Sequence, residues 1–316
     1  MRTIPALLAA CALVLSLGAL AQERILVPYP AGGPSDATGR VIANALSGQG
    51  KPFFVENLGG ATGLLAVNKF LANPQNQVFQ GTQNELILPV LLNQAAKFKS
   101  EDFVPVQYVT QTYLVLAVRK GLGVKNFDEF FALARSRKDS PLTYGTVGVG
   151  SLYHVMGEYL AKKKGVALNH IPYKGGAPAM QDLIGGQIDF SITPYQTAFD
   201  DMAAKGMFQV IGIFSAAKPP TLAKLQTASS VEGLTDFDFS SYAGYFLKRT
   251  AIEEEKQRAS ALFASAMADE KVKHSLQLDG RRVLSPVSLK EADAMYMAEI
   301  ARYKKLLETV GPIKLD

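Results

Sequence analysis

The sequence predicts an α/β protein with two lobes, each a mixed, mainly parallel sheet flanked by helices. Short apolar runs alternate along the chain with segments whose apolar residues recur at helical spacing. This alternation is typical of open, mainly parallel sheets. The predicted strands are too many for one simple sheet, and 316 residues are enough for two compact units. We therefore expect two lobes.

The first part of the chain begins with a predicted strand at 25–29 and a helix at 35–46. Within that helix, Ala37, Val41 and Ala45 fall on one face. The pattern continues with strands at 53–56, 78–81, 104–109 and 114–119, and with helices at 63–71 and 86–93.

Two later helix starts have recognisable caps. Asn126 and Glu129 have the N-x-x-E spacing that begins a helix, and Ser288 and Glu291 have the spacing of a capping box. The tail after residue 247 is predicted to be mostly helical. Between the two starts we expect strands at 142–145, 168–171, 188–192, 210–214 and 242–247, and helices at 152–163, 179–184 and ending near Lys205.

Two loop-rich stretches, 121–125 and 219–235, are the candidate crossings between the lobes. They assign residues 22–120 and 235–316 to lobe I and residues 121–234 to lobe II. In open α/β sheets, ligands bind beyond the carboxyl ends of the strands, where a strand leads into a helix. The glycine-rich loops at such positions are therefore the candidate site.

Composition excludes several classes of protein. With 48% hydrophobic and 19% charged residues, the chain is too apolar to be disordered. The net charge is +5, but the longest basic run is Lys162 to Lys164, so a nucleic-acid partner is disfavoured. Three His and one Cys leave little for a metal, iron–sulfur or thiol site. We expect neither a metal nor a cofactor.

The N-terminus has the pattern of a secretory signal peptide. Arg2 precedes an apolar run at 6–20, and a small-x-small pattern ends at Ala21. We expect residues 1–21 to be removed and the exported chain to begin at Gln22. An alternative lipoprotein cleavage before Cys11 would leave roughly half the apolar length that a signal needs. No later segment has the ~18 uninterrupted apolar residues of a membrane span, and the processed chain, lacking Cys11, contains no disulfide.

The first candidate loop, PYPAGGPSD at 28–36, joins the first strand to the first helix. Gly32 and Gly33 let the backbone approach a ligand closely. The helix start offers unpaired N–H groups and a partial positive charge, which suit a carboxylate. The loop lacks the G-x-x-x-x-G-K-[ST] pattern of a nucleotide site. The alternative is an ordinary turn capped by Ser35 or Asp36.

The second candidate loop, YGTVGVGSLYH at 144–154, has the same design. Thr146 and Ser151 offer hydroxyl groups beside the flexible Gly148 and Gly150, and His154 lies one turn into the helix. An exported serine hydrolase that uses Ser151 and His154 is the alternative function. The sequence lacks the G-x-S-x-G pattern of a nucleophile elbow, which disfavours that alternative.

Further polar groups follow other predicted strands. In HIPYKGGAP at 170–178, Tyr173 and Lys174 precede a helix, while His170 is expected to be a satisfied strand residue. Thr82, Asn84 and Glu85 follow the strand at 78–81, and Thr193 follows the strand at 188–192. These glycine loops share one design, and the chain is poor in His and has no structural Cys. Together these features indicate that backbone and hydroxyl groups bind a carboxylate.

These segments resemble the Bug-type solute receptors of tripartite tricarboxylate transporters, periplasmic binding proteins with similar loops in the same order. The resemblance rests on PYPAGGPSD, YGTVGVGSLYH, HIPYKGGAP and the following QDLIGGQIDF, and it covers nearly the whole processed chain. It implies a type II periplasmic binding clamshell whose cleft holds a ligand carboxylate. The implied ligand-binding residues are Tyr29, Ala31, Gly32, Gly33, Ser35, Asp36, Thr146, Gly150, Ser151, His154 and Tyr173, with Asp36 expected to fix the loop. Thr82, Asn84 and Thr193 complete the candidate set.

The resemblance implies a monomeric periplasmic receptor for a small organic acid: a dicarboxylate, an amino acid or an aromatic acid. The closed receptor would dock with a membrane permease or a sensor kinase. If Glu85 faces the cleft, it pairs with an amino group and favours an amino-acid ligand. A binding fold reused as a structural or signalling partner is a third possibility.

Overall fold

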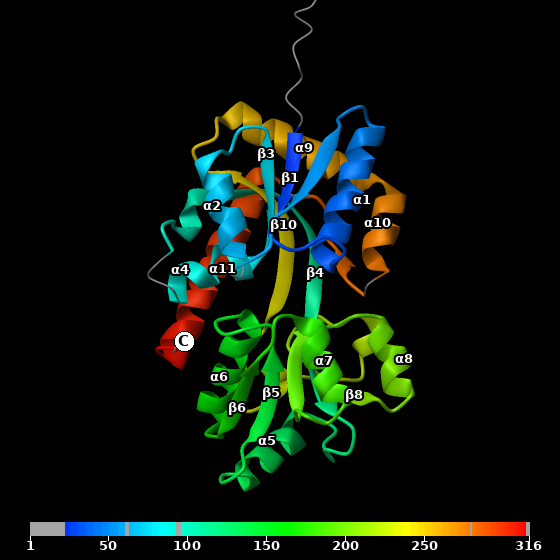
Figure 1. Ribbon diagram of the computed structural model, residues 1–316, viewed down its shortest axis with the longest axis vertical. Coiled ribbons are helices and arrows are strands. Elements are labelled where there is room, and N and C mark those ends of the chain that lie inside the picture. Colours follow the sequence, from blue (N-terminus) through cyan, green and yellow to red (C-terminus); the bar gives the residue numbers. More distant parts are fainter. Residues whose placement is uncertain (1–22, 61–62, 93–95, 279, 314–316) are drawn as a thin grey trace, which may run out of the picture.

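The computed structural model describes residues 23–60, 63–92, 96–278 and 280–313. The predicted signal peptide, its cleavage after Ala21 and the alternative at Cys11 lie outside these residues. Two lobes follow one another along the long axis of the molecule, each a sheet with helices around it (Figure 1). This arrangement confirms the predicted two-lobed α/β fold.

The upper lobe is built on strands from both ends of the described chain. β1 (Glu23–Val27) lies between β2 (Phe53–Asn57) and β3 (Gln77–Gly81), and all three are parallel. The other edge of β3 pairs antiparallel with β10 (Ser240–Lys248). The upper lobe therefore combines an early and a late segment of the sequence.

β4 (Phe103–Arg119) is one strand of 17 residues that runs through both lobes (Figure 1). Its residues up to Tyr113 pair with β10, and those from Leu114 pair with β7 and β8. The prediction of two strands at 104–109 and 114–119 was wrong. The polar stretch between them looked like a break, but it pairs with β10, and Gln111 Nε2 donates to Ser240 Oγ at 2.9 Å.

The lower lobe surrounds the second half of β4. β7 (Phe190–Pro194) pairs antiparallel with β4 and parallel with β5 (Leu142–Thr146), which in turn pairs parallel with β6 (Leu168–Pro172). On the other side of β4 lies β8 (Phe208–Ile213). The short strand β9 (Gln226–Thr227) pairs with β8, whereas β11 (Arg282–Val283) pairs with the first half of β4, at Thr110 and Gln111.

Helices cover the sheets in both lobes. In the upper lobe they are α1 (Pro34–Gly48), α2 (Leu64–Ala72), α3 (Gln83–Leu86), α4 (Leu88–Leu92), α9 (Glu253–Ala268), α10 (Glu270–Gln277) and α11 (Leu289–Val310). In the lower lobe they are α5 (Phe127–Ser136), α6 (Leu152–Lys164), α7 (Gly176–Ile184) and α8 (Ala198–Ala204). Short 3-10 turns occur at Ser100–Asp102, Pro220–Leu222 and Ala228–Ser230.

The helix starts test the capping predictions. The Asn126 side chain accepts a hydrogen bond from Glu129 N, and Ser288 and Glu291 form a complete capping box, so both predicted starts are confirmed. The helix predicted at 86–93 is instead two short helices, α3 and α4, and the first begins earlier. Its cap is Thr82, which forms a capping box with Glu85.

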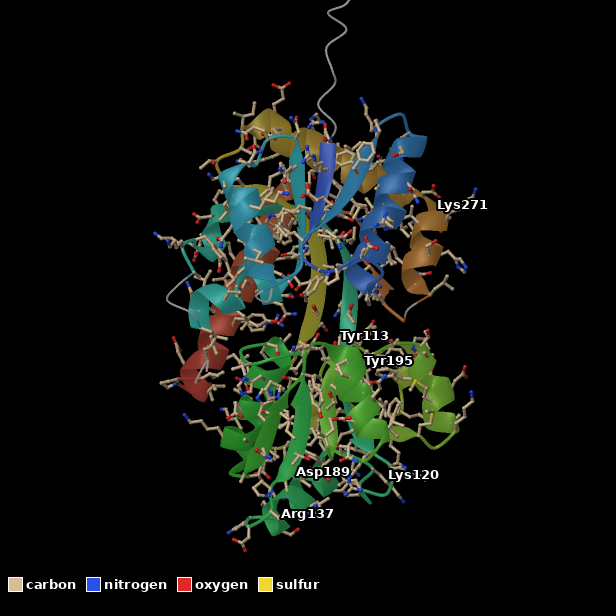
Figure 2. The ribbon with its side chains drawn as sticks, in the orientation of Figure 1. Tyr113, Lys120, Arg137, Asp189, Tyr195 and Lys271 are labelled. Atoms are coloured by element: carbon tan, nitrogen blue, oxygen red, sulfur yellow. The ribbon has the colours of Figure 1, made fainter. Side chains whose placement is uncertain are left out.

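The junction between the lobes is marked by Tyr113 and Tyr195 (Figure 2), where Tyr195 N donates to Tyr113 O at 2.8 Å. One hydrophobic core joins the two lobes: Tyr159 of α6 and Tyr303 of α11 are buried in the same cluster as Phe103 of β4. The lobe limits at residues 120 and 235 remain a prediction. The change in the pairing partners of β4 places the passage between lobes within that strand.

Candidate functional site

The start of α1 leaves its first amide groups uncapped. The N-cap residue is Gly33, which has no side chain to accept a hydrogen bond, and Pro34 occupies the first turn. Gly32 takes a φ of +85°, which favours glycine, and is exposed together with Ala31. The N–H groups of Ser35 and Asp36 at this start therefore suit an acceptor that comes from solution.

The loop before α1 is held by groups behind it. Asp36 Oδ2 accepts from Gly32 N at 2.8 Å and from Arg40 Nε at 2.9 Å, and Asp36 is only 3% exposed. The hydrogen bond from Arg40 is the main reason that the pKa of Asp36 is lowered. Gln80 Nε2 of β3 donates to Ser35 O at 2.7 Å. These contacts fix the loop and leave the first-turn amides of α1 unused.

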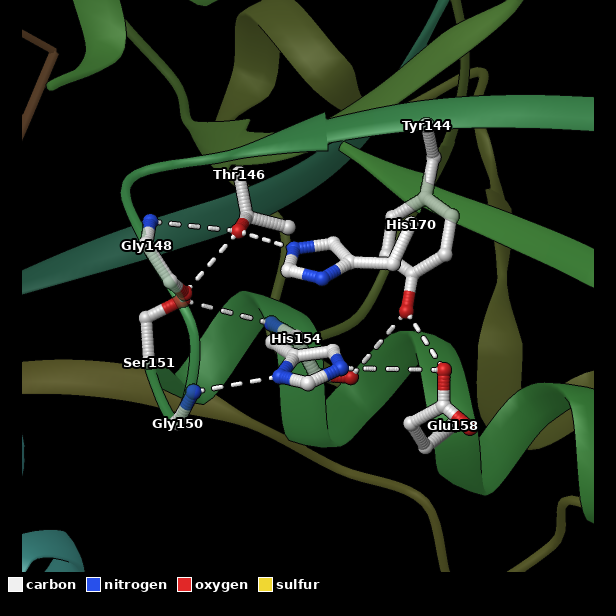
Figure 3. Close-up of polar contacts among 8 residues, drawn as sticks. All are labelled: Tyr144, Thr146, Gly148, Gly150, Ser151, His154, Glu158 and His170. Atoms are coloured by element: carbon white, nitrogen blue, oxygen red, sulfur yellow. Dashed lines mark hydrogen bonds and ion pairs between the residues drawn. The ribbon is translucent and has the colours of Figure 1, made fainter. Parts of the chain in front are cut away.

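The start of α6 is closed by its own side chains (Figure 3). Ser151 is the N-cap: its Oγ accepts from His154 N at 3.4 Å and donates to Gly148 O at 2.8 Å. Gly148 N donates to Thr146 Oγ1 at 3.2 Å, and Gly150 N donates to His154 Nδ1 at 3.1 Å. The donors expected to bind a ligand are therefore occupied within the loop.

Asn84 reaches from the upper lobe to the same helix. Its Oδ1 accepts from Leu152 N, the first residue of α6, at 3.3 Å. Asn84 also approaches the buried Tyr153 and lowers the pKa of that phenol, although burial and Glu85 raise it more. A side chain of lobe I thus takes another amide at the start of α6, and it ties the two lobes together.

Glu85 does not face the cleft, which corrects the expectation that it pairs with a ligand amino group. The residue is 0% exposed. One carboxylate oxygen accepts from the Tyr29 hydroxyl, and the other accepts from Thr82 N at 2.6 Å and from Thr82 Oγ1 at 2.8 Å. Burial raises the pKa of Glu85 and of the Tyr29 hydroxyl. The Glu85 carboxylate therefore joins Tyr29 to the start of α3.

The remaining predicted residues lie around the second loop. Tyr173 N donates to Thr146 O at 2.9 Å, and its hydroxyl donates to Asp182 Oδ2 at 2.7 Å. Lys174 is exposed. Thr193 is 7% exposed and pairs with Val115 of β4, so it lies within the sheet.

Two functional neighbours were not identified from the sequence. Arg40, which fixes Asp36, is four residues further along α1, and this spacing could have indicated the pair. Tyr153 is buried between the lobes near Asn84 and Glu85, and it lies inside the second motif. No pattern in the sequence indicated the hydrogen bond between Asn84 and Leu152 N across the lobes.

The hydrolase alternative finds no support in this geometry. Ser151 Oγ makes its hydrogen bonds to backbone groups, and the His154 ring makes its own to Gly150 N and lies 3.8 Å from Glu158 Oε1. A nucleophile–base pair requires a hydrogen bond between the hydroxyl and the imidazole. Within the described residues, the contacts of this serine and histidine contain no such bond.

Other features of the described chain lie apart from these loops. A cavity of about 260 Å³ opens between α6, residues 236–239 and α11, away from the starts of α1 and α6. Across residues 23–313, apart from the undescribed gaps, no three His, Cys, Asp or Glu side chains are grouped as metal ligands. No helix in the same part of the chain is long and apolar enough to cross a membrane.

Comparison with known proteins agrees with the fold. Residues 38–311 match the family described as tripartite tricarboxylate transporter family receptor. A UPF0065 protein of Agrobacterium vitis, from the TAR-I ttuE-ttuC' intergenic region, is 28% identical over 295 residues, which cover 91% of this chain and 84% of the relative.

Two solved structures show the same architecture. R. palustris Rpa4515 with adipate has a TM-score of 0.80 and 25% identity, covering 92% of this chain and 98% of that one. The periplasmic binding protein BugD has a TM-score of 0.77 and 24% identity, covering 93% and 98%. The fold is therefore that of two-lobed periplasmic binding proteins.

Proposed function

Because this chain belongs to the family of tripartite tricarboxylate transporter receptors, whose members are periplasmic binding proteins, we propose that it captures a small organic acid between its lobes. The bound acid favours the closed form, since a ligand shifts an equilibrium only by binding one state more tightly. The closed receptor then docks with a membrane permease of the tripartite type, or with a sensor.

The observation that carries this proposal is the uncapped start of α1. Its N–H groups lie at the positive end of a helix dipole, and no side chain caps them. A ligand carboxylate supplies the missing acceptor, with Ser35 Oγ as a further donor. The backbone from Ala31 to Gly33 surrounds the carboxylate, and the Tyr29 ring closes the side of the site.

We infer a dicarboxylate as the first ligand to test. Rpa4515, with 25% identity, was solved with adipate, a linear dicarboxylate. In this chain Asn84 contacts the start of α6, whose loop carries Thr146 and Ser151. These groups form the far wall, where a second acid group or a neutral tail is accommodated.

Titration calorimetry of ligand-stripped protein with adipate, combined with amide chemical-shift mapping, tests the proposal. We expect saturable binding, with the largest shifts at Ser35 and Asp36. Adipamide, of the same length but uncharged, is the matched control and should bind far more weakly. Failure of a folded protein to bind adipate or any acid of a carboxylate panel would refute the proposal, as would equal binding of the diamide.

A further inference from the structure

We propose that His154 and His170 are positioning residues, which hold the loop at 146–151 as a pair of stacked neutral imidazoles and release it when the pair is protonated. The loop is part of the proposed ligand site, so the effect on ligand affinity rests on the proposed function. The hold on the loop itself is a property of the protein alone.

The two imidazoles come from different elements and lie face to face (Figure 3). His154 is in α6 and His170 is in β6, and their ring centroids are 3.8 Å apart with an angle of 10° between the planes. Two positive charges at this separation would repel strongly in a partly buried place. The stack is therefore stable with two neutral rings.

Each ring holds one part of the loop. His154 Nδ1 accepts from Gly150 N at 3.1 Å, so this nitrogen carries a lone pair and the ring hydrogen lies on Nε2. His170 Nε2 lies 2.7 Å from Thr146 Oγ1, and that hydroxyl accepts from Gly148 N at 3.2 Å. The pair thus fixes Gly150 directly and Gly148 through Thr146.

The titratable groups around the pair favour its neutral form. Burial lowers the pKa of both rings, and His154 contributes further to lowering the pKa of His170 to about 4. Glu158 Oε1 lies 3.8 Å from His154 Nε2 and raises the pKa of that ring in part. The same oxygen accepts from the Tyr144 hydroxyl at 2.9 Å. Tyr144, whose ring is 5.0 Å from His170, brings no charge.

Protonation reverses the role of one atom. A proton on His154 Nδ1 makes this nitrogen a donor that faces the N–H donor of Gly150, so their hydrogen bond is lost. The new charge also lies against the ring of His170. The loop between Thr146 and Ser151 then loses one of its attachments to α6, the one at Gly150, and the wall of the ligand site becomes less rigid.

Imidazole and amide NMR of the ligand-free protein between pH 7.5 and 4 tests the positioning role. The chain contains three His, so the exposed His274 serves as an internal reference outside the pair. We expect His154 to report the Nε2–H tautomer at pH 7, and the Gly150 amide to shift along the titration curve of His154. A Gly150 amide that does not follow His154, or the opposite tautomer, would overturn the proposal.

Adipate affinity supplies the second readout. Between pH 7 and pH 4.5 we expect wild-type affinity to fall about fivefold more than that of His154→Asn. In this variant Oδ1 replaces Nδ1 as an acceptor that does not titrate. Protonation of adipate itself affects both proteins equally, so only the difference counts. An equal fall in both proteins would contradict the positioning role.

His154→Asn gives a second comparison, because it removes the charge that lies against the ring of His170. We expect His170 to titrate at a higher pH in this variant than in the wild type, since His154 contributes to lowering its pKa; an unchanged His170 midpoint would contradict the pairing. If neither the wild type nor the variants bind adipate at any pH, the proposed function fails. The NMR titration of the ligand-free protein still tests the positioning role of the two histidines.

Discussion

The starts of α1 and α6 are built from the same parts, a strand, a glycine loop and a helix, and one lies in each lobe. At α1 the cap is a glycine and the loop is exposed. At α6 the cap is Ser151, and the loop donors are taken by Thr146, His154 and Asn84. The first amides of α1 remain available to a ligand from solution, whereas those at the start of α6 are hydrogen-bonded within the protein.

This difference shows that a shared motif does not imply a shared role. The sequence suggested that both helix starts grasp the acid group together. We propose an unequal division, in which α1 binds the carboxylate and the α6 loop forms a preformed wall. A protein acceptor that already bonds the first amides of a helix leaves no free N–H group there for a ligand.

Capping α1 should have the largest effect. In Gly33→Asp, the new carboxylate accepts from the first-turn amides and repels an anion, so adipate affinity should fall about a hundredfold. Gly33→Ala is the matched control: the φ of −88° suits any residue and the nearest atom to the added Cβ is 3.7 Å away. Calorimetry should find near wild-type affinity for this control. Equal losses in both variants would place the acid group elsewhere.

Acid should loosen the α6 loop before the α1 loop. His170 has a lowered pKa in the folded protein, so the unfolded chain binds more protons as the pH falls below about 6.5. Because His170 is partly exposed, solvent screening reduces this effect, and the free energy of unfolding should fall by about 2 kcal/mol down to pH 4. The pKa of Asp36 is lowered as well, so its contacts at α1 are lost only below about pH 4.

Urea unfolding at several pH values measures this slope. In His170→Gln the slope between pH 6.5 and 4 should be flatter. Amide exchange should accelerate at Gly150 before it does at Gly32. A slope unchanged in the variant would remove the histidine pair as its cause.

Two serine variants separate stability from binding. Ser151→Ala removes the cap of α6 and should reduce the free energy of unfolding by about 1 kcal/mol, with a smaller loss of adipate affinity than Ser35→Ala. Ser35→Ala should do the opposite and weaken adipate about fivefold, with little change in stability. Denaturant unfolding and calorimetry on the same samples measure both quantities. The reverse assignment would show that α6, not α1, holds the acid group.

Removing the contact across the lobes should have the smallest effect. Asn84→Ala loses the hydrogen bond to Leu152 N and should shift the ligand-free protein toward the open form about threefold. Asn84→Asp keeps the acceptor and adds a charge that suits a helix start, so it should shift the other way. Distance measurements by fluorescence transfer between labelled lobes follow the shift. If both variants shift the open–closed equilibrium equally, the hydrogen bond from Leu152 N to residue 84 does not stabilise the closed form.

The fold was largely predictable, because local patterns decide most elements. The caps at Asn126 and Ser288 are short-range signals, and the structure realises both. β4 was not predictable, because its polar middle is satisfied by β10, a strand far away in the sequence. The Thr82–Glu85 box was a readable signal that places Glu85 behind its own helix start and not in the cleft.

The two glycine loops and their helix starts were predictable from the sequence, but the availability of their amide groups was not. Glycine loops after strands identified both helix starts. Tertiary contacts decide which of these amides remain free. Asn84 of the other lobe accepts from Leu152 N, and His154, one turn into α6, accepts from Gly150 N. Residue spacing in the sequence does not show which amides are already hydrogen-bonded, since these bonds form only in the folded protein.

The strand order of the upper lobe determines the order in which the molecule can assemble. β3 needs β10 along one edge, and the whole lower lobe lies between these two strands in the chain. A chain that emerges from its N-terminus therefore pairs β7 and β8 with the end of β4 before β10 is available, because these contacts close shorter loops. Until β10 arrives, β3 presents a bare edge, and it is there that a stalled chain would associate with a neighbour.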